Sequence, residues 1–558
     1  MDTNILIIFL AYLSLICSVI GYGSLFSKYI FKKKSNLNFG YLGTVGIVIL
    51  SIYSYFSHIF IAHNIGHNLI LILLGILFFL IFCRKRSKEI LFSLSIFSII
   101  FISLIIFKTH DDFPYYHFGY SYYITQTSLH IGVGQFNHGF NTPSLIFYLN
   151  SLFYLPLIKF YFFHLPAVLF LGFTNIIFIK YLTDAFKNKE INFTHYFTLF
   201  SILFINIFFY RIAEHGTDRS AQILIFLLLL EVLIFIYLES LNKIQLSKIF
   251  LLLGLIISLK AFYVLYIIIL IPVFFKLKEH YSFKNIFIIL INNYSFYLFT
   301  GLFLLVLLTN FVNSGCLIYP VGLTCFTNLD WSISYELVKH MNNWYEQWSK
   351  AGAGPNFRVT NASEYIKGFN WTSNWMDKYF FNKVSDFLFG IFFLTIIVGA
   401  LSYSKEKKFF FINKYAYLLY FLLILLLFEW FYNHPSLRYG GFILFCSILF
   451  IPASFLYSGF KVNFYKLKKI FSLLIIFSLL VFVGRNLFRI NSEITKYDFN
   501  PLKDFSYRVK KSHYSIQESM DSPIKNFIAC KNKTVDCKGN IEPKVSKLLN
   551  KFKFTREN

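Results

Sequence analysis

The sequence predicts an all-α membrane protein that crosses the bilayer about fourteen times and carries large loops on the exported side. Two features of composition predict this class: 57% of the 558 residues are hydrophobic, and only 14% are charged. A third is that apolar runs of about 17 to 25 residues, the length of a membrane-crossing helix, recur along the chain. A soluble core does not need so much apolar sequence.

The predicted spans are separated by short polar segments. Two of them, 248–260 and 261–276, are short, so this pair is also interpretable as a broken or re-entrant helix. The segment 1–23 lacks the basic start of a signal peptide, and we expect it to be retained as part of the first span. The spans are 5–26, 39–61, 68–83, 90–107, 161–181, 194–211, 222–240, 248–260, 261–276, 286–311, 386–403, 414–431, 439–459 and 467–486.

Lysine and arginine predict the orientation, because short cytoplasmic loops are enriched in them. Basic loops such as "SKYIFKKK", "CRKRSKE", "DAFKNKE" and "KVNFYKLKK" alternate with loops that contain few lysines, such as "AHNIGH" and "NHPSLRYGG". Both termini are therefore predicted outside. The predicted organisation is a four-span segment (1–107), a first exported loop (108–166), a central bundle (167–311), a large exported loop (312–385), a second four-span segment (386–486) and an exported basic tail (487–558).

Two exported segments are predicted to form helices near the membrane surface. The stretch "ISYELVKHMNNWYEQW" places Leu337, Trp344 and Trp348 at a spacing that favours an amphipathic helix. The stretch at 145–160 is interpreted as an interfacial helix, and the alternative is a tilted extra span, which would invert everything after it.

The cysteines support this orientation. Cys316 and Cys325 form one closely spaced pair on the predicted outer side, and Cys530 and Cys537 form another. Such pairs in an exported compartment predict disulfides, although chance spacing of unreacted thiols is the alternative. Neither pair has the C-x2-C spacing typical of zinc sites.

The net charge of +25 does not predict a nucleic-acid partner. The excess is mainly lysine, in a chain rich in Phe, Ile, Asn and Tyr, which share AT-rich codons. No soluble basic domain or nucleic-acid-binding motif is present, so we expect membrane lipids rather than nucleic acid as partners.

Three polar clusters lie at the predicted outer ends of spans, where ionisable groups are costly and are functional candidates. We expect the bundle to bring them around one cleft, with carboxylates as base and arginines as phosphate ligands. In "HDDFPYYHF" they are His110, Asp111, Asp112 and His117; in "RIAEHGTDRSAQ" they are Glu214, His215, Asp218 and Arg219; in "HPSLRYGG" they are His434, Arg438 and Tyr439.

Each cluster also has a structural interpretation. Asp111 and Asp112 are in a position to cap a helix, Asp218 and Arg219 are in a position to form a simple ion pair, and Arg438 is in a position to anchor the end of a span. The histidines His110, His117, His130 and His138 fit no zinc spacing, which favours structural or hydrogen-bonding roles.

The motifs "HDDFPYYHF", "GVGQFNHGF", "SLIFYLNSLFYLP", "SGCLIYP" and "RYGG" resemble a bacterial family of multi-pass membrane proteins with no assigned activity. In topology the chain resembles the GT-C class of glycosyltransferases, which carry an acidic motif in an early exported loop and use lipid-linked sugars. One difference is that GT-C enzymes usually place this motif after the first span, whereas here it follows the fourth.

The resemblance implies a glycosyltransferase in the bacterial inner membrane that assembles cell-envelope glycan on the exported face. Its donor would be a polyprenyl-phosphate sugar and its acceptor a glycan or lipid. Arg219 and Arg438 would hold the phosphate, and Asp111 or Asp112 would act as base or bind a divalent cation, Mg²⁺ or Mn²⁺. The alternatives are a polysaccharide polymerase or ligase, or a flippase or secondary transporter, for which Glu231 is the chief mid-span ionisable residue.

Overall fold

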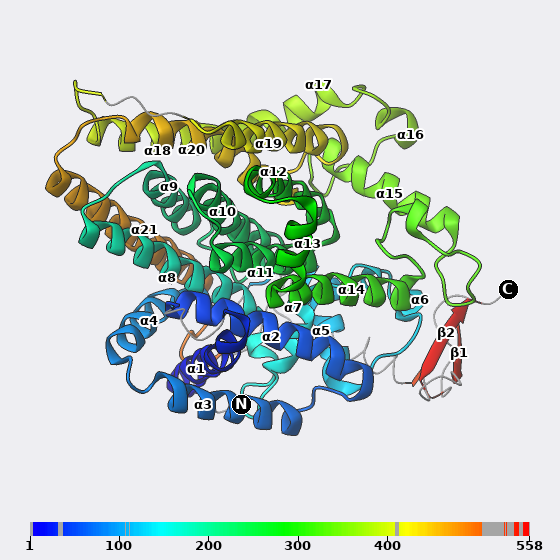
Figure 1. Cartoon of the computed structure of the whole chain (residues 1–558). Coiled ribbons are helices and arrows are strands. Elements are labelled where there is room, and N and C mark those ends of the chain that lie inside the picture. The colour runs from blue at the N-terminus through cyan, green and yellow to red at the C-terminus, as the bar shows by residue number, and fades with distance from the viewer. Residues whose placement is uncertain are drawn as a thin grey trace.

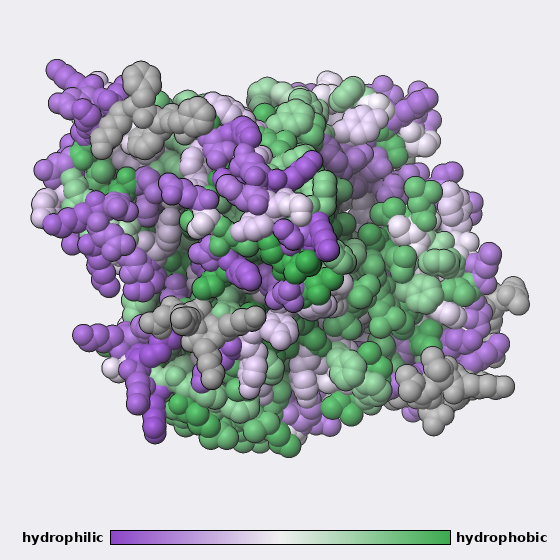
Figure 2. Space-filling view, in the orientation of Figure 1, coloured by the Kyte–Doolittle hydropathy of each residue, from purple (hydrophilic) through white to green (hydrophobic). Residues whose placement is uncertain are grey.

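The protein is an all-α polytopic membrane protein (Figure 1). The computed structural model describes residues 4–31, 37–106, 108–110, 112–407, 412–504, 529–530, 532, 541–545 and 551–556. Helices packed side by side form the body, and a two-stranded hairpin lies beyond one end of the bundle. Hydrophobic surface covers α3 and α14, whereas hydrophilic side chains gather along the left edge of Figure 2.

The helices of the first two-thirds are α1 (Ile5–Ile30), α2 (Phe39–Phe60), α3 (Ile65–Cys83), α4 (Ser87–Ile100), α5 (Phe118–Gln126), α6 (Val133–Phe136), α7 (Leu145–Leu152), α8 (Leu165–Asn188), α9 (Phe193–Phe208), α10 (Gly216–Tyr237), α11 (Lys243–Leu259), α12 (Leu270–His280), α13 (Phe283–Ile291) and α14 (Tyr294–Ser314). They are followed by α15 (Tyr335–Lys350), α16 (Ala362–Tyr365), α17 (Thr372–Trp375), α18 (Ser385–Leu401), α19 (Lys414–Asn433), α20 (Gly441–Ser458), α21 (Phe464–Tyr497), β1 (Ile541–Val545) and β2 (Phe552–Arg556). Short 3₁₀ segments are η1 (Phe101–Ser103), η3 (His138–Asn141), η4 (Phe160–His164), η5 (Ala261–Ile269), η6 (Gly322–Thr324) and η8 (Leu437–Tyr439); η2 (Phe113–His117) and η7 (Met376–Val384) are π-helical.

Each of the fourteen predicted spans overlaps a helix, but 286–311 is divided between α13 and α14, and the helix of 90–107 ends at Ser103. Within the described part of the chain, eleven helices are long and apolar enough to cross a membrane. The other three predicted spans lie on α4, α9 and α11, which have 14, 16 and 17 residues. The protein therefore has the predicted series of helices, and three of them are short for a straight crossing of a ~30 Å hydrocarbon core.

The predicted cytoplasmic loops lie together. Arg86 Nη2 donates to Leu37 O at 2.7 Å, which joins the loop after α3 to the loop after α1. Lys461 N donates to Glu406 O at 3.0 Å, which joins the loop after α20 to the loop after α18. These contacts agree with the alternation read from lysine and arginine.

The predicted outer loops also lie together. His63 N donates to Ile124 O at 3.0 Å, and Asn68 Nδ2 donates to Ser151 O at 2.8 Å, so the loop between α2 and α3 rests on the segment 108–166. Which of the two ends faces the cytoplasm stays a prediction.

Helix α7 is too short to be an extra span. It has eight residues, Leu145–Leu152, about 12 Å of helix, and all eight are buried in protein. The chain then turns through Leu155 and Lys159 into η4 and α8. The topology is therefore not inverted, and α7 is a buried helix rather than a surface helix with one exposed face.

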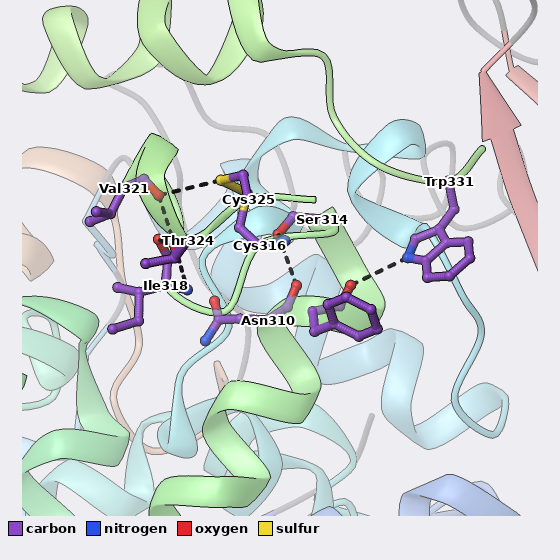
Figure 3. The surroundings of a disulfide bond; sticks show 9 residues. Asn310, Ser314, Cys316, Ile318, Val321, Thr324, Cys325 and Trp331 are labelled. Atoms are coloured by element: carbon purple, nitrogen blue, oxygen red, sulfur yellow. Dashed lines mark hydrogen bonds between the residues drawn. A yellow bond between two sulfur atoms is a disulfide. The ribbon is translucent and has the colours of Figure 1, made fainter. Parts of the chain in front are cut away.

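The large outer loop begins with a disulfide between Cys316 and Cys325, as predicted (Figure 3). Cys316 N donates to Ser314 Oγ at 3.2 Å, and Trp331 Nε1 donates to Phe311 O at 3.3 Å, so the loop is fixed to the end of α14 (Figure 3). Beyond it, α15 forms the predicted helix over 335–350.

The end of the tail is folded against the outer loops. Phe554 N donates to Ile131 O at 2.9 Å, the Phe554 side chain is buried, and Lys553 Nζ lies 2.5 Å from Asp330 Oδ2. Cys530 is buried and disulfide-bonded, whereas Cys537 lies outside the described residues. The predicted exported elements thus share one end of the bundle.

We expect Cys316→Ser to lower the free energy of unfolding by about 2 to 3 kcal/mol, because the bond closes a short loop and restricts the unfolded chain. Thermal unfolding of the purified protein in detergent measures this. Cys446→Ser, a change to a buried free cysteine in α20, is the matched control for thiol loss. Reduction of the wild type should lower its stability by at least as much as Cys316→Ser does, because reduction also breaks the disulfide of Cys530. Unchanged stability on reduction would contradict the prediction.

Candidate functional site

Four charged side chains from distant segments meet at the predicted outer end of the bundle. They are Asp112, Asp218, Lys260 and Arg438, and we call them the four-charge cluster. Arg438 Nη2 donates to Asp112 Oδ2, and Arg438 Nε donates to Asp218 Oδ2. Lys260 Nζ donates to the other oxygen of Asp218. The two carboxylates and two cations balance in charge, with Arg438 bridging both acids.

Arg438 is held by the loop between α19 and α20. Trp375 Nε1 donates to Pro435 O at 2.8 Å, and Trp430 Nε1 donates to Ser436 O at 2.8 Å. Leu437 N donates to Tyr379 Oη at 2.9 Å. The aromatic residues of the large outer loop and α19 therefore fix the backbone on which the guanidinium stands.

Steric constraints explain why both residues after Tyr439 in "RYGG" are glycines. Gly440 has a φ of 99°, a left-handed value that side chains with a Cβ disfavour. A Cβ on Gly441 would lie 2.6 Å from the Trp430 ring. The motif is thus the tight turn that ends Arg438's loop and starts α20.

Asp218 and Lys260 are placed by helix ends. Asp218 lies in the first turn of α10, and Lys260 lies at the break between α11 and η5, where its backbone is extended. Tyr263 Oη donates to Asp218 O at 3.4 Å, and Lys260 Nζ lies 4.5 Å from the centre of the Tyr439 ring. At this break in the predicted broken helix 248–276, the chain directs the Lys260 side chain toward Asp218 in the four-charge cluster.

The cluster is partly open to solvent. The side chains of Asp112, Lys260 and Arg438 are 27%, 27% and 23% exposed, whereas Asp218 is only 7% exposed. Three of the four side chains are thus partly exposed, and Asp218 is the buried partner of both cations.

Asp112 does not cap the helix that follows it. It precedes the π-helical turn η2 and makes no side-chain capping hydrogen bond. Burial alone would raise the pKa of Asp112, but the adjacent Arg438 guanidinium, with smaller help from His117 and His110, lowers that pKa to about 2. The carboxylate is therefore ionised and bound to Arg438.

The predicted histidines surround the cluster. His110 Nδ1 accepts from Asp112 N at 3.1 Å, and its ring lies 5.0 Å from the ring of His215. His434 lies on the other side, with its ring 5.9 Å from that of Tyr439. Burial lowers the pKa of His117 to about 3 and the pKa of His434 to about 4, so both rings are neutral at pH 7.

Asp112 predicts a specific loss of stability in acid. Because the pKa of Asp112 is lower in the folded than in the unfolded protein, its contribution is present above about pH 4 and is lost as the pH falls toward 2. We expect the stability difference between wild type and Asp112→Asn to shrink over that interval, measured as thermal midpoints in detergent. Asp377→Asn, at an exposed residue of η7, should track the wild type. A constant difference across the interval would contradict the prediction.

Two predicted residues lie outside the four-charge cluster. Arg219 does not pair with Asp218: its Nη1 donates to Arg211 O at 3.0 Å, and its guanidinium lies over the ring of Phe209. Glu214 accepts from Arg211 Nε at 2.9 Å and lies 3.6 Å from Arg489 Nη1 of α21. This second set of charges ties α21 to the start of α10.

Asp111 lies outside the described residues. Among the residues that the structure does describe, no group of three His, Cys, Asp or Glu side chains is placed to hold a metal ion. A divalent cation at Asp111 or Asp112 stays a prediction.

Sequence reasoning missed Lys260 and used Trp348 only as part of an amphipathic stripe. Trp348, from α15, has its ring 5.6 Å from that of Tyr439 and 5.9 Å from the Arg438 guanidinium. The signal for Lys260 was available, since it is a lone charge between two short apolar runs. Trp348 gives the cluster an aromatic wall.

No curated protein and no solved structure matches the chain. Residues 5–445 match one protein family, described as a domain of unknown function, DUF8201. The match covers all four residues of the four-charge cluster. The chain therefore belongs to the DUF8201 family.

Proposed function

We propose that the protein is a membrane glycosyltransferase that uses a polyprenyl-phosphate-linked sugar on the exported face of the bacterial inner membrane. The observation that carries the proposal is the meeting of Asp112, Asp218, Lys260 and Arg438 at the predicted outer end of the bundle. Two cations suit a lipid-linked phosphate, and a reachable carboxylate suits an attacking hydroxyl.

Arg438 and Lys260 are the phosphate ligands in this proposal. Arg438 presents a planar set of donors from a fixed loop, which favours two-point binding of phosphate. Lys260 replaces Arg219 in the role first expected from sequence, because Arg219 lies on another face of α10. Both cations stabilise the negative charge that develops on the leaving phosphate.

Asp112 is the proposed general base. With a pKa of about 2 it is a weak base while Arg438 holds it. When the donor phosphate takes the Arg438 donors, Asp112 loses the partner that lowers its pKa and becomes a stronger base. Donor binding thus prepares the base before an acceptor reacts.

The charges balance through the step. The acceptor oxygen forms a bond to the anomeric carbon, and the bond from that carbon to the phosphate oxygen breaks with its electron pair going to the phosphate. The acceptor proton passes to Asp112, so the cluster gains one positive charge as the polyprenyl phosphate gains one negative charge. Asp218 positions both cations, and Trp348 and Tyr439 offer apolar faces to a sugar ring.

A transport function has less support. Glu231, its chief candidate, is buried, accepts from Gln245 Nε2 and lies 3.5 Å from Lys248 Nζ. Glu231 lines neither the small cavity of about 10 Å³ beside His117 and Glu214 nor the larger cavity at the opposite end of the bundle. Its charge is therefore neutralised by a local partner.

Complementation tests the proposal in cells. A strain that lacks the gene should lose a cell-envelope glycan, and wild type or Asp377→Asn should restore it. Asp112→Asn should reach the same level in the membrane without restoring the glycan. Equal restoration by Asp112→Asn would rule out Asp112 as the base, and a normal glycan in the deletion strain would end the proposal.

A further inference from the structure

A second cavity lies at the predicted cytoplasmic end of the helix bundle, the end opposite to the four-charge cluster. Its volume is about 460 Å³, and it lies among the α8–α9 loop, the start of α9, the α20–α21 loop and the start of α21. In Figure 1 these elements meet at the left, where Figure 2 shows hydrophilic side chains. We propose that this cavity binds the headgroup of an anionic phospholipid.

The lining has both parts that such a ligand needs. Lys189 and Lys461 supply positive charge, and the described residues that line the cavity include no Asp or Glu. Phe460, Phe464 and Leu467 supply apolar surface at the end of a span. A phosphate joined to an acyl chain matches this combination, and basic pockets between helices on the cytoplasmic side commonly bind anionic headgroups.

A buried hydroxyl also points to a ligand. Tyr196 is only 1% exposed and lines the cavity, and the Ser402 hydroxyl forms a hydrogen bond with it. Each hydroxyl carries one proton, so the pair uses one proton between its members and has a second to donate. A phosphate oxygen in the cavity would accept from Tyr196. The amino ends of α9 and α21 adjoin the same space and add positive dipole character.

The backbone of Lys189 allows a test that does not harm folding. This residue ends α8 with a φ of 57°, a left-handed conformation in which glycine or asparagine is favoured. Glycine at this position should therefore not weaken the fold. Lys461 Nζ lies 3.2 Å from Glu406 Oε2 of the α18–α19 loop, in an exposed ion pair with which a phosphate would compete.

Lys189→Gly separates lipid binding from folding, because the change should weaken lipid binding without lowering the stability of the fold. In vesicles of phosphatidylcholine alone, Lys189→Gly should unfold at the same temperature as wild type or higher. In vesicles that also contain phosphatidylglycerol, wild type should gain stability and Lys189→Gly should gain less. Each lysine removed should weaken phosphatidylglycerol binding about fivefold, measured by native mass spectrometry of the full chain.

Two controls test whether general surface charge, or a phosphate without a lipid, accounts for the effect. The double variant Lys187→Gln, Lys468→Gln removes two exposed lysines of the same end that do not line the cavity, and should bind as wild type does. Lys189→Gly, Lys461→Gln should bind about 25-fold more weakly. Equal loss in both double variants would overturn the site, because attraction would then be a general surface effect. Equal protection by glycerol phosphate or inorganic phosphate would overturn the lipid as ligand.

Discussion

Arg438→Ala is expected to lower the free energy of unfolding by about 3 to 5 kcal/mol and to abolish activity. Arg438 is the only member of the four-charge cluster that bonds to both Asp112 and Asp218. Its removal leaves two carboxylates close together with Lys260 alone to balance them. Thermal and denaturant unfolding in detergent, together with envelope glycan in cells, measure the two effects.

Two matched variants separate charge from geometry. Arg438→Lys keeps the charge but has no planar donors to bridge two carboxylates, so it should regain part of the stability and little activity. Arg358→Lys, at an exposed position of the same outer loop, should behave as wild type. If Arg438→Lys restored full activity, two-point binding by Arg438 would be excluded.

Asp112→Asn is expected to reduce the rate of sugar transfer by about 10²- to 10⁴-fold and to lose the stability that the ion pair with Arg438 contributes above about pH 4. The amide keeps the shape of the carboxylate and cannot take a proton. Asp218→Asn should instead cost more stability than Asp112→Asn, because Asp218 is buried and bonds to both cations. Unfolding midpoints and initial rates of the purified variants give the comparison.

The split between kcat and KM distinguishes the two acids. A base should affect kcat, whereas a positioning residue such as Asp218 should affect KM for the lipid-linked donor as well, because it orients Arg438 and Lys260. A loss confined to KM in Asp112→Asn would show that Asp112 only positions Arg438.

The sequence was sufficient to predict that the polar clusters converge. Asp112, Asp218 and Arg438 each follow or precede an apolar span, and the lysine pattern placed all three at the same end. Helices of similar length bring residues at their ends to similar depth. That part of the site depends only on span order, which hydropathy reports well.

The direction of individual side chains was not predictable in the same way. Arg219 was expected to join Asp218, but successive residues of a helix point about 100° apart, so α10 turns Asp218 into the cluster and Arg219 toward Phe209. The lone charge of Lys260 between two apolar runs was visible in the sequence, but its direction depends on the extended backbone of this residue between α11 and η5, which hydropathy does not report.

The short helix α7 shows a second limit. Its apolar residues favour a surface or spanning helix, and its burial comes from α2, α5 and α8 packing around it. Such tertiary contacts are set by distant parts of the chain. The sequence thus predicted the helix but not its surroundings.

Release of polyprenyl phosphate from a polyprenyl-phosphate sugar is the most direct test of the proposed site. The purified protein would be reconstituted with envelope lipids that contain the acceptors, and radiolabelled polyprenyl-phosphate sugars made by host membranes would serve as donors. We expect wild type and Asp377→Asn to release polyprenyl phosphate and to transfer the label, and Asp112→Asn and Arg438→Lys to do so at least about 100-fold more slowly. Equal release by all four proteins, or none by wild type with any donor and acceptor fraction, would contradict the proposed function.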